Sequence, residues 1–297
     1  MELAERQRTR RLEKRRLPGP RRWRRWAAPA LLLLAPLTQS TCATTHNYLD
    51  LAGPRYEGRC APPPATDARV PPSGTLRVVT FNIEFGRQIE GAVDLLRESE
   101  TLRGADVLLL QELDPAGVRR IAHELGLNYV YFPSGVHPFS GRDFGTAILS
   151  PWPLEDARKI VLPHAAFITN LRRAATSATV LRGSARTRVY SVHLPAPGAV
   201  SSDERHEQVR LILNDAAGSI DAVVIGGDFN SRSVGKWFEK AGYHWLTKNL
   251  PGTARRFGIW WSLDHVFARG LRPEGNGAGF VESAGTSDHR VVWARLR

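Results

Sequence analysis

The sequence predicts an α/β or α+β fold in packed layers, and three observations carry this prediction. Between residues 76 and 296, short apolar runs of strand length alternate with amphipathic stretches of helical period. Two apolar runs, 174–181 and 187–193, flank Arg182-Gly183-Ser184, which has the composition of a hairpin turn. Hydrophobic residues make up 42% of the 297 residues, enough for a substantial core. Such elements bury their apolar faces by packing helices on sheets.

The expected elements follow in order along this region, and no internal repeat is evident. Strands are expected over 76–82, 106–111, 129–132, 146–150, 174–181, 187–193, 222–228, 262–267 and 289–296. Helices are expected over 92–102, 116–125 and 203–216, the last with Asp203 as its cap or first-turn acid.

Residues 1–42 have the layout of an export signal. Residues 1–26 carry a net charge of +8, and an apolar run of about eleven residues follows, too short to cross a bilayer. Cys42 stands where a bacterial lipoprotein signal places its lipid-modified cysteine. We expect an exported protein, periplasmic, membrane-anchored or extracellular, and leave open whether Cys42 is lipidated to form a membrane tether at the N-terminus. The alternatives are an uncleaved basic tail or a short membrane anchor. A membrane-surface adaptor whose Arg-rich terminus binds anionic lipid is a further possibility.

Residues 43–73 contain six prolines and no sustained hydrophobic period, which predicts a linker before a domain at 74–297. Most of the formal charge of +12 lies in the N-terminal tail, so the basicity does not itself indicate nucleic acid. Cys42 and Cys60 are the two cysteines, which excludes a disulfide-rich scaffold and a thiolate zinc site. They could pair only if Cys42 carries no lipid.

Polar side chains that bury poorly occur where the expected strands end. They are Asn82, Glu112, His193, Asp228, Asn230, Asp264, His265 and Ser287-Asp288-His289. If these strands share a layered sheet structure, their ends converge on one pocket, where open α/β sheets bind ligands. Each residue alone is also compatible with a turn, a cap or a core-edge position. Their joint occurrence in this order favours a functional site.

The residue types suit phosphoester hydrolysis with a divalent cation. Mg²⁺ prefers oxygen ligands, which Glu112 and Asn82, with Asp288, can supply. Asp228 can position or deprotonate water. Donors to the phosphoryl oxygens are available from Asn230, His193 and His289. Asp264 is the candidate to fix the tautomer of His289.

Seven short stretches, in this order, resemble the endonuclease/exonuclease/phosphatase superfamily over about residues 76–296. They are Thr80-Phe81-Asn82-Ile83, Leu110-Gln111-Glu112-Leu113, Gly145-Thr146-Ala147-Ile148-Leu149-Ser150, Ser191-Val192-His193-Leu194, Gly227-Asp228-Phe229-Asn230, Leu263-Asp264-His265-Val266 and Ser287-Asp288-His289.

The resemblance implies a four-layer α/β/β/α sandwich of two packed mixed sheets. It implies a metal site for Mg²⁺, or Mn²⁺, formed by Glu112 and Asn82 with Asp288 nearby. It also implies catalytic roles for Asp228, Asn230, His193, His289 and Asp264. Arg142 and Arg173 lie in segments that often contact substrate, although structural ion pairs explain them equally well. We expect His265 to pack in the core, and Thr146 departs from an Asn common in relatives.

We therefore expect a metal-dependent hydrolase that cleaves phosphodiesters or phosphomonoesters by in-line attack of water. Family frequency favours a nuclease-like phosphodiesterase. The alternatives are a phospholipid, sphingomyelin or inositol-phosphate hydrolase and a non-catalytic module that binds phosphorylated ligands. Trp245, Trp260 and Trp261 could form a stacking or interfacial surface, but we favour burial in the core. We expect a monomer.

Overall fold

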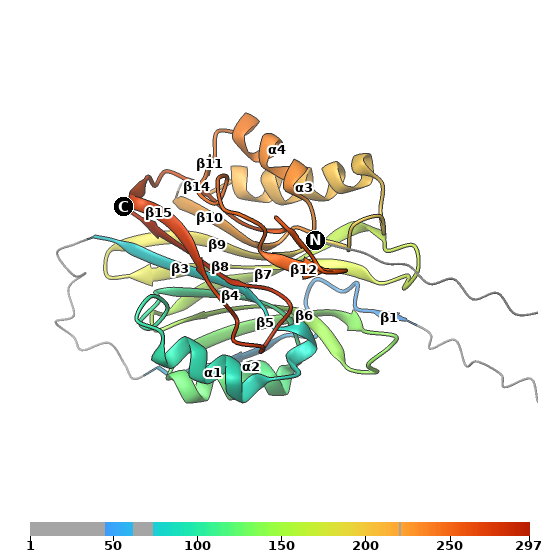
Figure 1. The fold of residues 1–297 in the computed structure, drawn as a ribbon, viewed down its shortest axis with the longest axis horizontal. Helices are drawn as coiled ribbons and strands as arrows, with labels where there is room; N and C mark the ends of the chain where they lie inside the picture. The colour runs from blue at the N-terminus through green and yellow to red at the C-terminus, as the bar shows by residue number, and fades with distance from the viewer. Residues whose placement is uncertain (1–44, 62–73, 220) are drawn as a thin grey trace, which may run out of the picture. The chain divides into compact units, whose positions relative to one another are not determined.

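The computed structural model describes residues 45–61, 74–219 and 221–297 (Figure 1). Two large mixed sheets form the centre of this part of the chain. The first sheet has the order β1-β5-β6-β4-β3-β16-β15, with β2 also paired to β5. Its strands are β1 (His46–Asn47), β2 (Tyr56–Gly58), β3 (Leu76–Asn82), β4 (Val107–Leu113), β5 (Asn128–Val136), β6 (Asp143–Ser150), β15 (Pro273–Val281) and β16 (Val291–Leu296).

The second sheet has the order β11-β14-β10-β9-β8-β7. Its strands are β7 (Leu154–Ala165), β8 (Arg172–Arg182), β9 (Ala185–His193), β10 (Ala222–Asp228), β11 (His244–Trp245) and β14 (Asp264–Arg269). A separate hairpin consists of β12 (Ala254–Arg256) and β13 (Ile259–Trp261). The helices are α1 (Ile89–Glu98), α2 (Pro115–Leu125), α3 (Ser202–Ala217) and α4 (Gly235–Lys240), with 3₁₀ turns at Glu84–Gly86 and Arg232–Val234.

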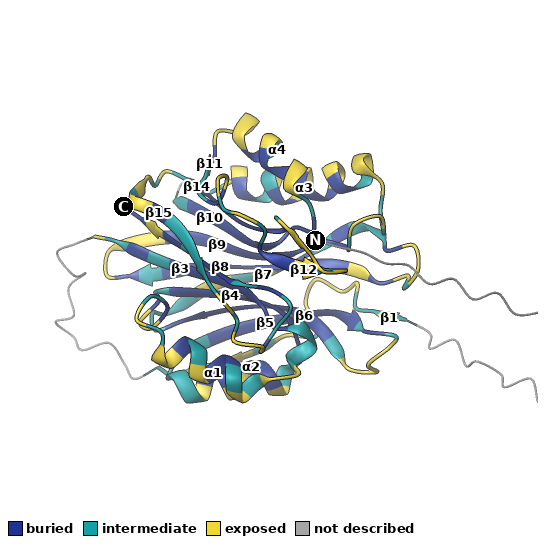
Figure 2. Ribbon diagram, viewed as in Figure 1, coloured by how far each residue is buried: buried dark blue, intermediate teal, exposed yellow. Residues whose placement is uncertain are grey.

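Three apolar clusters hold these elements in four layers. One cluster joins α1 and α2 to the first sheet, for example Val93 and Ile121 against Leu110. The second joins the two sheets, and the third joins α3 and α4 to the second sheet. Figure 2 shows the sheet interiors buried and the outer faces of the helices exposed. The predicted four-layer α/β/β/α sandwich is confirmed.

The helix predicted over 92–102 lies instead at Ile89–Glu98. It ends early because Ser99 has extended backbone, with ψ 120°. The hairpin between β8 and β9 turns at Gly183, whose φ is 62°, as expected. Asp203 lies in the first turn of α3, while Ser201 is its cap and forms a reciprocal capping box with Glu204.

Part of the stretch predicted as a linker has regular structure. Within residues 45–61, β1 and β2 each pair with β5, so this segment extends the first sheet. Strands of two and three residues are too short to show a hydrophobic period, which is why the sequence pattern did not indicate them. The segment 1–42, for which export is predicted, and residues 62–73 lie outside the described residues, so the expected role of Cys42 is not described either. Within the described residues, Cys60 forms no disulfide.

Among the described residues, none of the helices has the length and apolar composition that a membrane crossing requires.

Candidate active site

The site lies where strands of both sheets end. In the second sheet, Asp228 at the end of β10 is the register partner of His193 on parallel β9 and of Asp264 on antiparallel β14. In the first sheet, parallel β3 and β4 pair Asn82 with Gln111. Since the two sheets pack face to face, these strand ends come together.

Irregular backbone conformations orient the carboxylates of Glu112 and Asp228. Glu112 has a φ of 61° and lies at a register shift between β4 and β6. Such bulges redirect side chains and are common beside active sites. Gly227, with φ 149°, precedes Asp228, and a Cβ at Gly227 would lie 1.9 Å from the Val192 carbonyl oxygen. Only glycine therefore allows β9 and β10 to approach closely here.

The carboxylate of Asp228 is the centre of the site and is fully buried. Its Oδ1 accepts the backbone N–H of Asn230 at 2.8 Å. Its Oδ2 accepts the side-chain amides of Asn82 at 3.1 Å and Asn230 at 3.0 Å. The Asn82 amide also donates to Glu112 Oε1 at 3.1 Å, so one amide joins the two carboxylates.

Two imidazoles flank this carboxylate. The Nε2 atoms of His193 and His289 lie 3.5 Å and 3.8 Å from Asp228 Oδ2. His193 Nε2 is also 3.7 Å from Glu112 Oε1. Asp264 holds His289 through contacts of 2.9 and 3.1 Å between its carboxylate oxygens and Nδ1. This is the orienting pair that the sequence predicts.

The two imidazoles differ in charge. Burial lowers the pKa of His289, but the charges of Asp264 and Asp228 outweigh it and raise this pKa to about 10. Burial and the nearby Arg173 guanidinium hold the pKa of His193 well below its usual range. Burial also raises the pKa of Asp228 to about 6 and raises that of Glu112. At neutral pH the site therefore contains one imidazolium and one neutral imidazole.

A cavity of about 340 Å³ opens over this cluster. Glu112, His193, Asn230 and Asp288 line it. Arg173 lines it too, is 9% exposed, and its Nε and Nη1 have no hydrogen-bond partner in the described residues. Burial lowers the pKa of Arg173 to about 10, so it remains cationic at neutral pH. A buried guanidinium with free donors suits an anionic ligand.

The structure thus brings together all eight residues predicted as catalytic or metal-binding. The placements of Asn82 and Asp288 need further description. The oxygen of the Asn82 amide accepts the Glu84 N–H at 3.1 Å, so its NH₂ group faces the carboxylates. Asp288 lies at the cavity mouth with its Oδ1 3.9 Å from His289 Nε2 and a side chain 40% exposed.

The remaining sequence candidates separate into structural and surface positions. Arg142 forms an ion pair with Asp114 at 2.5 Å. Of the two roles considered for Arg142, substrate contact or a structural ion pair, the structure shows the ion pair. His265 is buried against aromatic rings, as expected for a packing residue. Thr146 is buried and bonds the Thr176 hydroxyl at 2.9 Å.

The expectation of a buried tryptophan cluster is wrong for two of its three members. Trp245 packs against Phe267, but Trp260 and Trp261 on β13 are 40% and 46% exposed. They are exposed because β13 pairs only with β12, and this two-stranded hairpin lies outside both large sheets.

Several cavity residues were missed from the sequence, and Glu84 and Arg256 are two charged examples. Glu84 Oε2 accepts the backbone N–H of Asp288 at 3.1 Å, and its position two residues after Asn82 is a signal that could have indicated it. Arg256 lies on the β12–β13 hairpin, whose strands of three residues have no recognisable sequence period.

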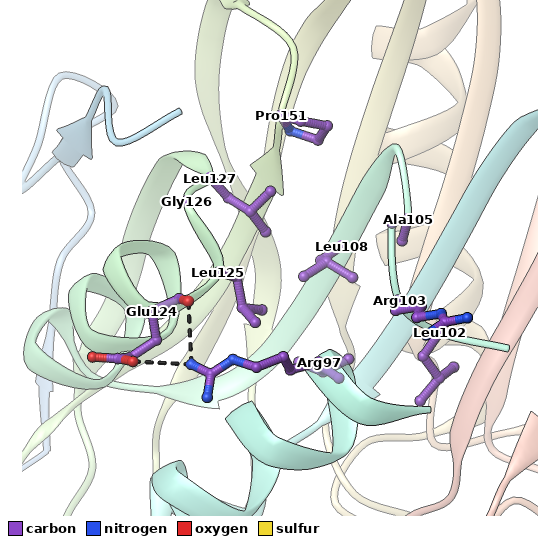
Figure 3. Close-up of a pocket in the computed structure, with 12 residues that line it drawn as sticks. Arg97, Leu102, Arg103, Ala105, Leu108, Glu124, Leu125, Gly126, Leu127 and Pro151 are labelled. Atoms are coloured by element: carbon purple, nitrogen blue, oxygen red, sulfur yellow. Dashed lines mark hydrogen bonds and ion pairs between the residues drawn. The ribbon is translucent and has the colours of Figure 1, made fainter. Parts of the chain in front are cut away.

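A second cavity, of about 320 Å³, lies between α1, α2 and the end of β6. Figure 3 shows Arg97 of α1 reaching the carbonyl and carboxylate of Glu124, at 3.2 and 2.9 Å. Its lining is mostly apolar and includes none of the predicted site residues.

Comparison with protein families identifies the family of this chain. A model of the Endonuclease/Exonuclease/phosphatase family matches residues 79–289. Among curated protein sequences, none matches this chain.

Similar solved structures share the fold at low identity. Humanized D. rerio TDP2 has 17% identity and a TM-score of 0.61, over 75% of this chain and 99% of that one. An endonuclease/exonuclease/phosphatase from Beutenbergia cavernae has 21% identity and a TM-score of 0.59, over 75% and 71%. A mannosyl-6-phosphatase from Bacteroides thetaiotaomicron has 16% identity and a TM-score of 0.57, over 75% and 99%.

Proposed function

Since the chain belongs to the Endonuclease/Exonuclease/phosphatase family, we propose that it is a divalent-cation-dependent hydrolase that cleaves phosphodiester bonds by in-line attack of water. The observation that carries this proposal is the Asp228 carboxylate, held by two amides and within 4 Å of the Nε2 atoms of both imidazoles. In the reaction, water loses a proton and bonds to phosphorus, the P–O ester bond breaks, and the leaving alkoxide takes up a proton.

Asp228 would accept the proton from water. Its three hydrogen bonds from Asn82 and Asn230 fix its orientation, so little rearrangement is needed during proton transfer. With a pKa of about 6, the carboxylate is ionised at neutral pH yet basic enough to take part.

Three cationic or neutral donors would stabilise the phosphoryl oxygens. His289 is protonated and its Nε2 has no hydrogen-bond partner in the part of the chain described. Arg173 contributes two free donors from the cavity wall. His193, close to both carboxylates, supplies a neutral imidazole. Such preorganised donors act on charge that develops in the transition state.

The residues present fit Mg²⁺ or Mn²⁺. Burial disfavours the charged form of Glu112, so a cation at the cavity mouth would stabilise its carboxylate. Glu112 would hold the ion, with Asp288 and Asn82 beside it. The ion would supply Lewis-acid polarisation of the phosphoryl group.

The test is hydrolysis of bis(p-nitrophenyl) phosphate by the full chain in Mg²⁺ and then in EDTA. We expect activity that EDTA abolishes and Mg²⁺ or Mn²⁺ restores. Asp228→Ala should lower turnover by roughly 10²–10⁴-fold. Asp94→Ala is the matched control, because Asp94 is an exposed carboxylate on α1. Full turnover by Asp228→Ala would refute its role, and activity in EDTA would refute the metal requirement.

We further propose that residues 1–42 direct export, that Cys42 is a lipid attachment site and that the enzyme is a monomer. The basic and apolar layout of this segment supports export. Fractionation of cells that express the full chain or Cys42→Ser tests export and lipid attachment. Release of Cys42→Ser from the membrane fraction is expected, and an unprocessed cytosolic chain would contradict export.

A further inference from the structure

Four large apolar side chains are almost entirely in solvent at loop tips. Phe139 lies between β5 and β6, Phe167 and Ile168 between β7 and β8, and Phe257 at the tip of the β12–β13 hairpin. Their exposed fractions are 78%, 89%, 81% and 101% in that order. The hairpin adds Ile259, Trp260 and Trp261, which are 61%, 40% and 46% exposed. Apolar exposure of this kind indicates an interaction surface.

These loops surround the mouth of the active-site cavity. Phe139 and Ile168 line it from two loops, and Arg256 lines it from the hairpin. A fourth loop, 196–200, contributes Ala199, whose carbonyl accepts the Phe167 N–H at 2.9 Å. We call the loops 138–142, 166–170 and 196–200, together with the hairpin 254–261, the apolar rim. A substrate must pass this rim to reach Asp228.

All charged residues of the apolar rim are positively charged. Its four segments contain no Asp or Glu, and their charged residues are Arg142, Arg255 and Arg256. This composition complements a surface that is apolar inside and phosphate-bearing outside. Tryptophan and arginine beside fully exposed phenylalanine suit the boundary between acyl chains and head groups.

Backbone pairing anchors the β12–β13 hairpin to the active site. Its Ala254 pairs with His289, and Arg255 N donates to the Asp288 carbonyl at 2.8 Å. The Arg290 guanidinium stacks 3.8 Å from the Trp260 ring centroid. The hairpin is thus fixed to the segment that bears His289, while its tip, Phe257, is left in solvent.

We propose that the apolar rim docks on a phospholipid bilayer and that the substrate is the phosphodiester of a lipid head group. This proposal rests on the proposed hydrolase function. A nucleic acid fits less well, because its bases stack on aromatic rings. The exposed Ile168 and Ile259 have no ring for a base to stack on. Docking places the cavity mouth at the level of the head-group phosphates and lets the apolar tips enter the acyl region.

The test compares the full chain with Phe167→Ser/Phe257→Ser. Neither residue lines the cavity, so hydrolysis of soluble bis(p-nitrophenyl) phosphate should be unchanged. Co-sedimentation with vesicles of phosphatidylcholine and phosphatidylglycerol should fall by about tenfold or more, since two phenylalanines no longer enter the bilayer. Hydrolysis of the vesicle phospholipid should fall in parallel. Leu211→Ser removes an exposed apolar residue on α3 and should change nothing.

Three results would separate the possibilities. Equal vesicle binding by all variants would overturn docking through the rim and assign any binding to the basic N-terminal segment. Loss of single-stranded DNA binding in the double variant, with vesicle binding intact, would identify a base-stacking surface and overturn the lipid proposal. Vesicle binding through the rim without hydrolysis of any diester in Mg²⁺ would refute the proposed function and leave docking standing.

Discussion

His289 carries a positive charge because two carboxylates face it. Its Nδ1 contacts Asp264 at 2.9 Å, and its Nε2 lies 3.8 Å from Asp228. Burial alone would favour the neutral ring, but these charges raise the pKa to about 10. His289 therefore remains a proton donor over the whole physiological range, while Asp228, with a pKa of about 6, becomes a base above that pH.

The opposite protonation requirements predict a bell-shaped dependence of kcat/KM on pH. Activity should rise as pH passes about 6, when Asp228 ionises, and fall as pH passes about 10, when His289 loses its proton. Asp264→Asn removes the largest charge that favours the His289 imidazolium. Burial then lowers the pKa of His289. The alkaline limb should move to lower pH by about one unit or more.

Asp94→Asn, an exposed substitution on α1, is the control for this profile. The acid and alkaline limbs of its pH–activity profile should match those of the wild type. An alkaline limb that stays near pH 10 in Asp264→Asn would show that His289 is not the group that titrates there.

The residue types of the site were predictable, whereas its protonation states and members such as Glu84 and Arg256 were not. Carboxylates, amides and imidazoles stood out because they follow apolar strands, where unpaired polar groups bury poorly. The charge of His289 depends on distances to Asp228 and Asp264, which come from different strands. Arg256 enters through a hairpin of three-residue strands, and local sequence pattern does not reveal such contacts.

At the scale of the elements, β9 and β10 bring His193 and Asp228 together through a close approach at Gly227. Gly227→Ala would place a Cβ 1.9 Å from the Val192 carbonyl oxygen at a φ of 149°. We expect a loss of about 3 kcal/mol or more in unfolding free energy, since backbone must move. Turnover should fall even where the protein remains folded.

Gly218→Ala is the matched control, because Gly218 has a φ of −72° and its added Cβ would meet only the Asp215 carbonyl oxygen at 3.6 Å. Denaturant unfolding and diester hydrolysis measure both variants. Wild-type stability and activity in Gly227→Ala would contradict the close strand approach.

The start of α2 supports Glu112, which lies two residues before its cap. Asp114 Oδ1 accepts the Gly117 N–H at 2.8 Å, and its Oδ2 pairs with the partly exposed Arg142. Asp114→Ala should lower unfolding free energy by about 1–2 kcal/mol through loss of the cap. Arg142→Ala removes only the ion pair and should cost less than about 1 kcal/mol. Equal losses in urea unfolding would mean that the ion pair, and not the cap, dominates.

The length of an element decided whether its sequence pattern was informative. The strands β3, β8, β9 and β10 are seven to eleven residues long and were predicted close to their bounds. The strands β1, β2, β12 and β13 are two or three residues long and depend on pairing partners far along the chain or across a turn. The early end of α1 follows from the extended backbone of Ser99, which composition does not reveal.

At the scale of the whole molecule, periodicity indicated layers, but the number and order of layers came from the family resemblance. The middle core illustrates why. Val78 of the first sheet and Val189 of the second belong to one cluster, although more than a hundred residues separate them. A strand pattern shows which residues are apolar and not which sheet will cover them.

The segment 45–61 is the part of the molecule where sequence and structure differ most, and truncation tests its role. Its carbonyls at Tyr48, Asp50 and Gly53 accept the ammonium of buried Lys159 at 2.6, 3.2 and 3.2 Å. A chain of residues 45–297 should retain the stability of the full chain. A chain of residues 62–297 loses β1, β2 and these acceptors, which leaves a buried cation unpaired. We expect its Tm to fall by about 10 °C or more, since such a charge costs about 3–5 kcal/mol.

Lys159→Met distinguishes loss of the acceptors from loss of the strands. In the 62–297 chain this substitution should recover part of the lost Tm, because no uncompensated charge remains. In the 45–297 chain the same substitution should give no gain, since the three carbonyls then lose their donor. Thermal unfolding followed by circular dichroism measures all four proteins. Equal Tm values for 45–297 and 62–297 would show that the segment is an energetically neutral linker, as its proline content indicates.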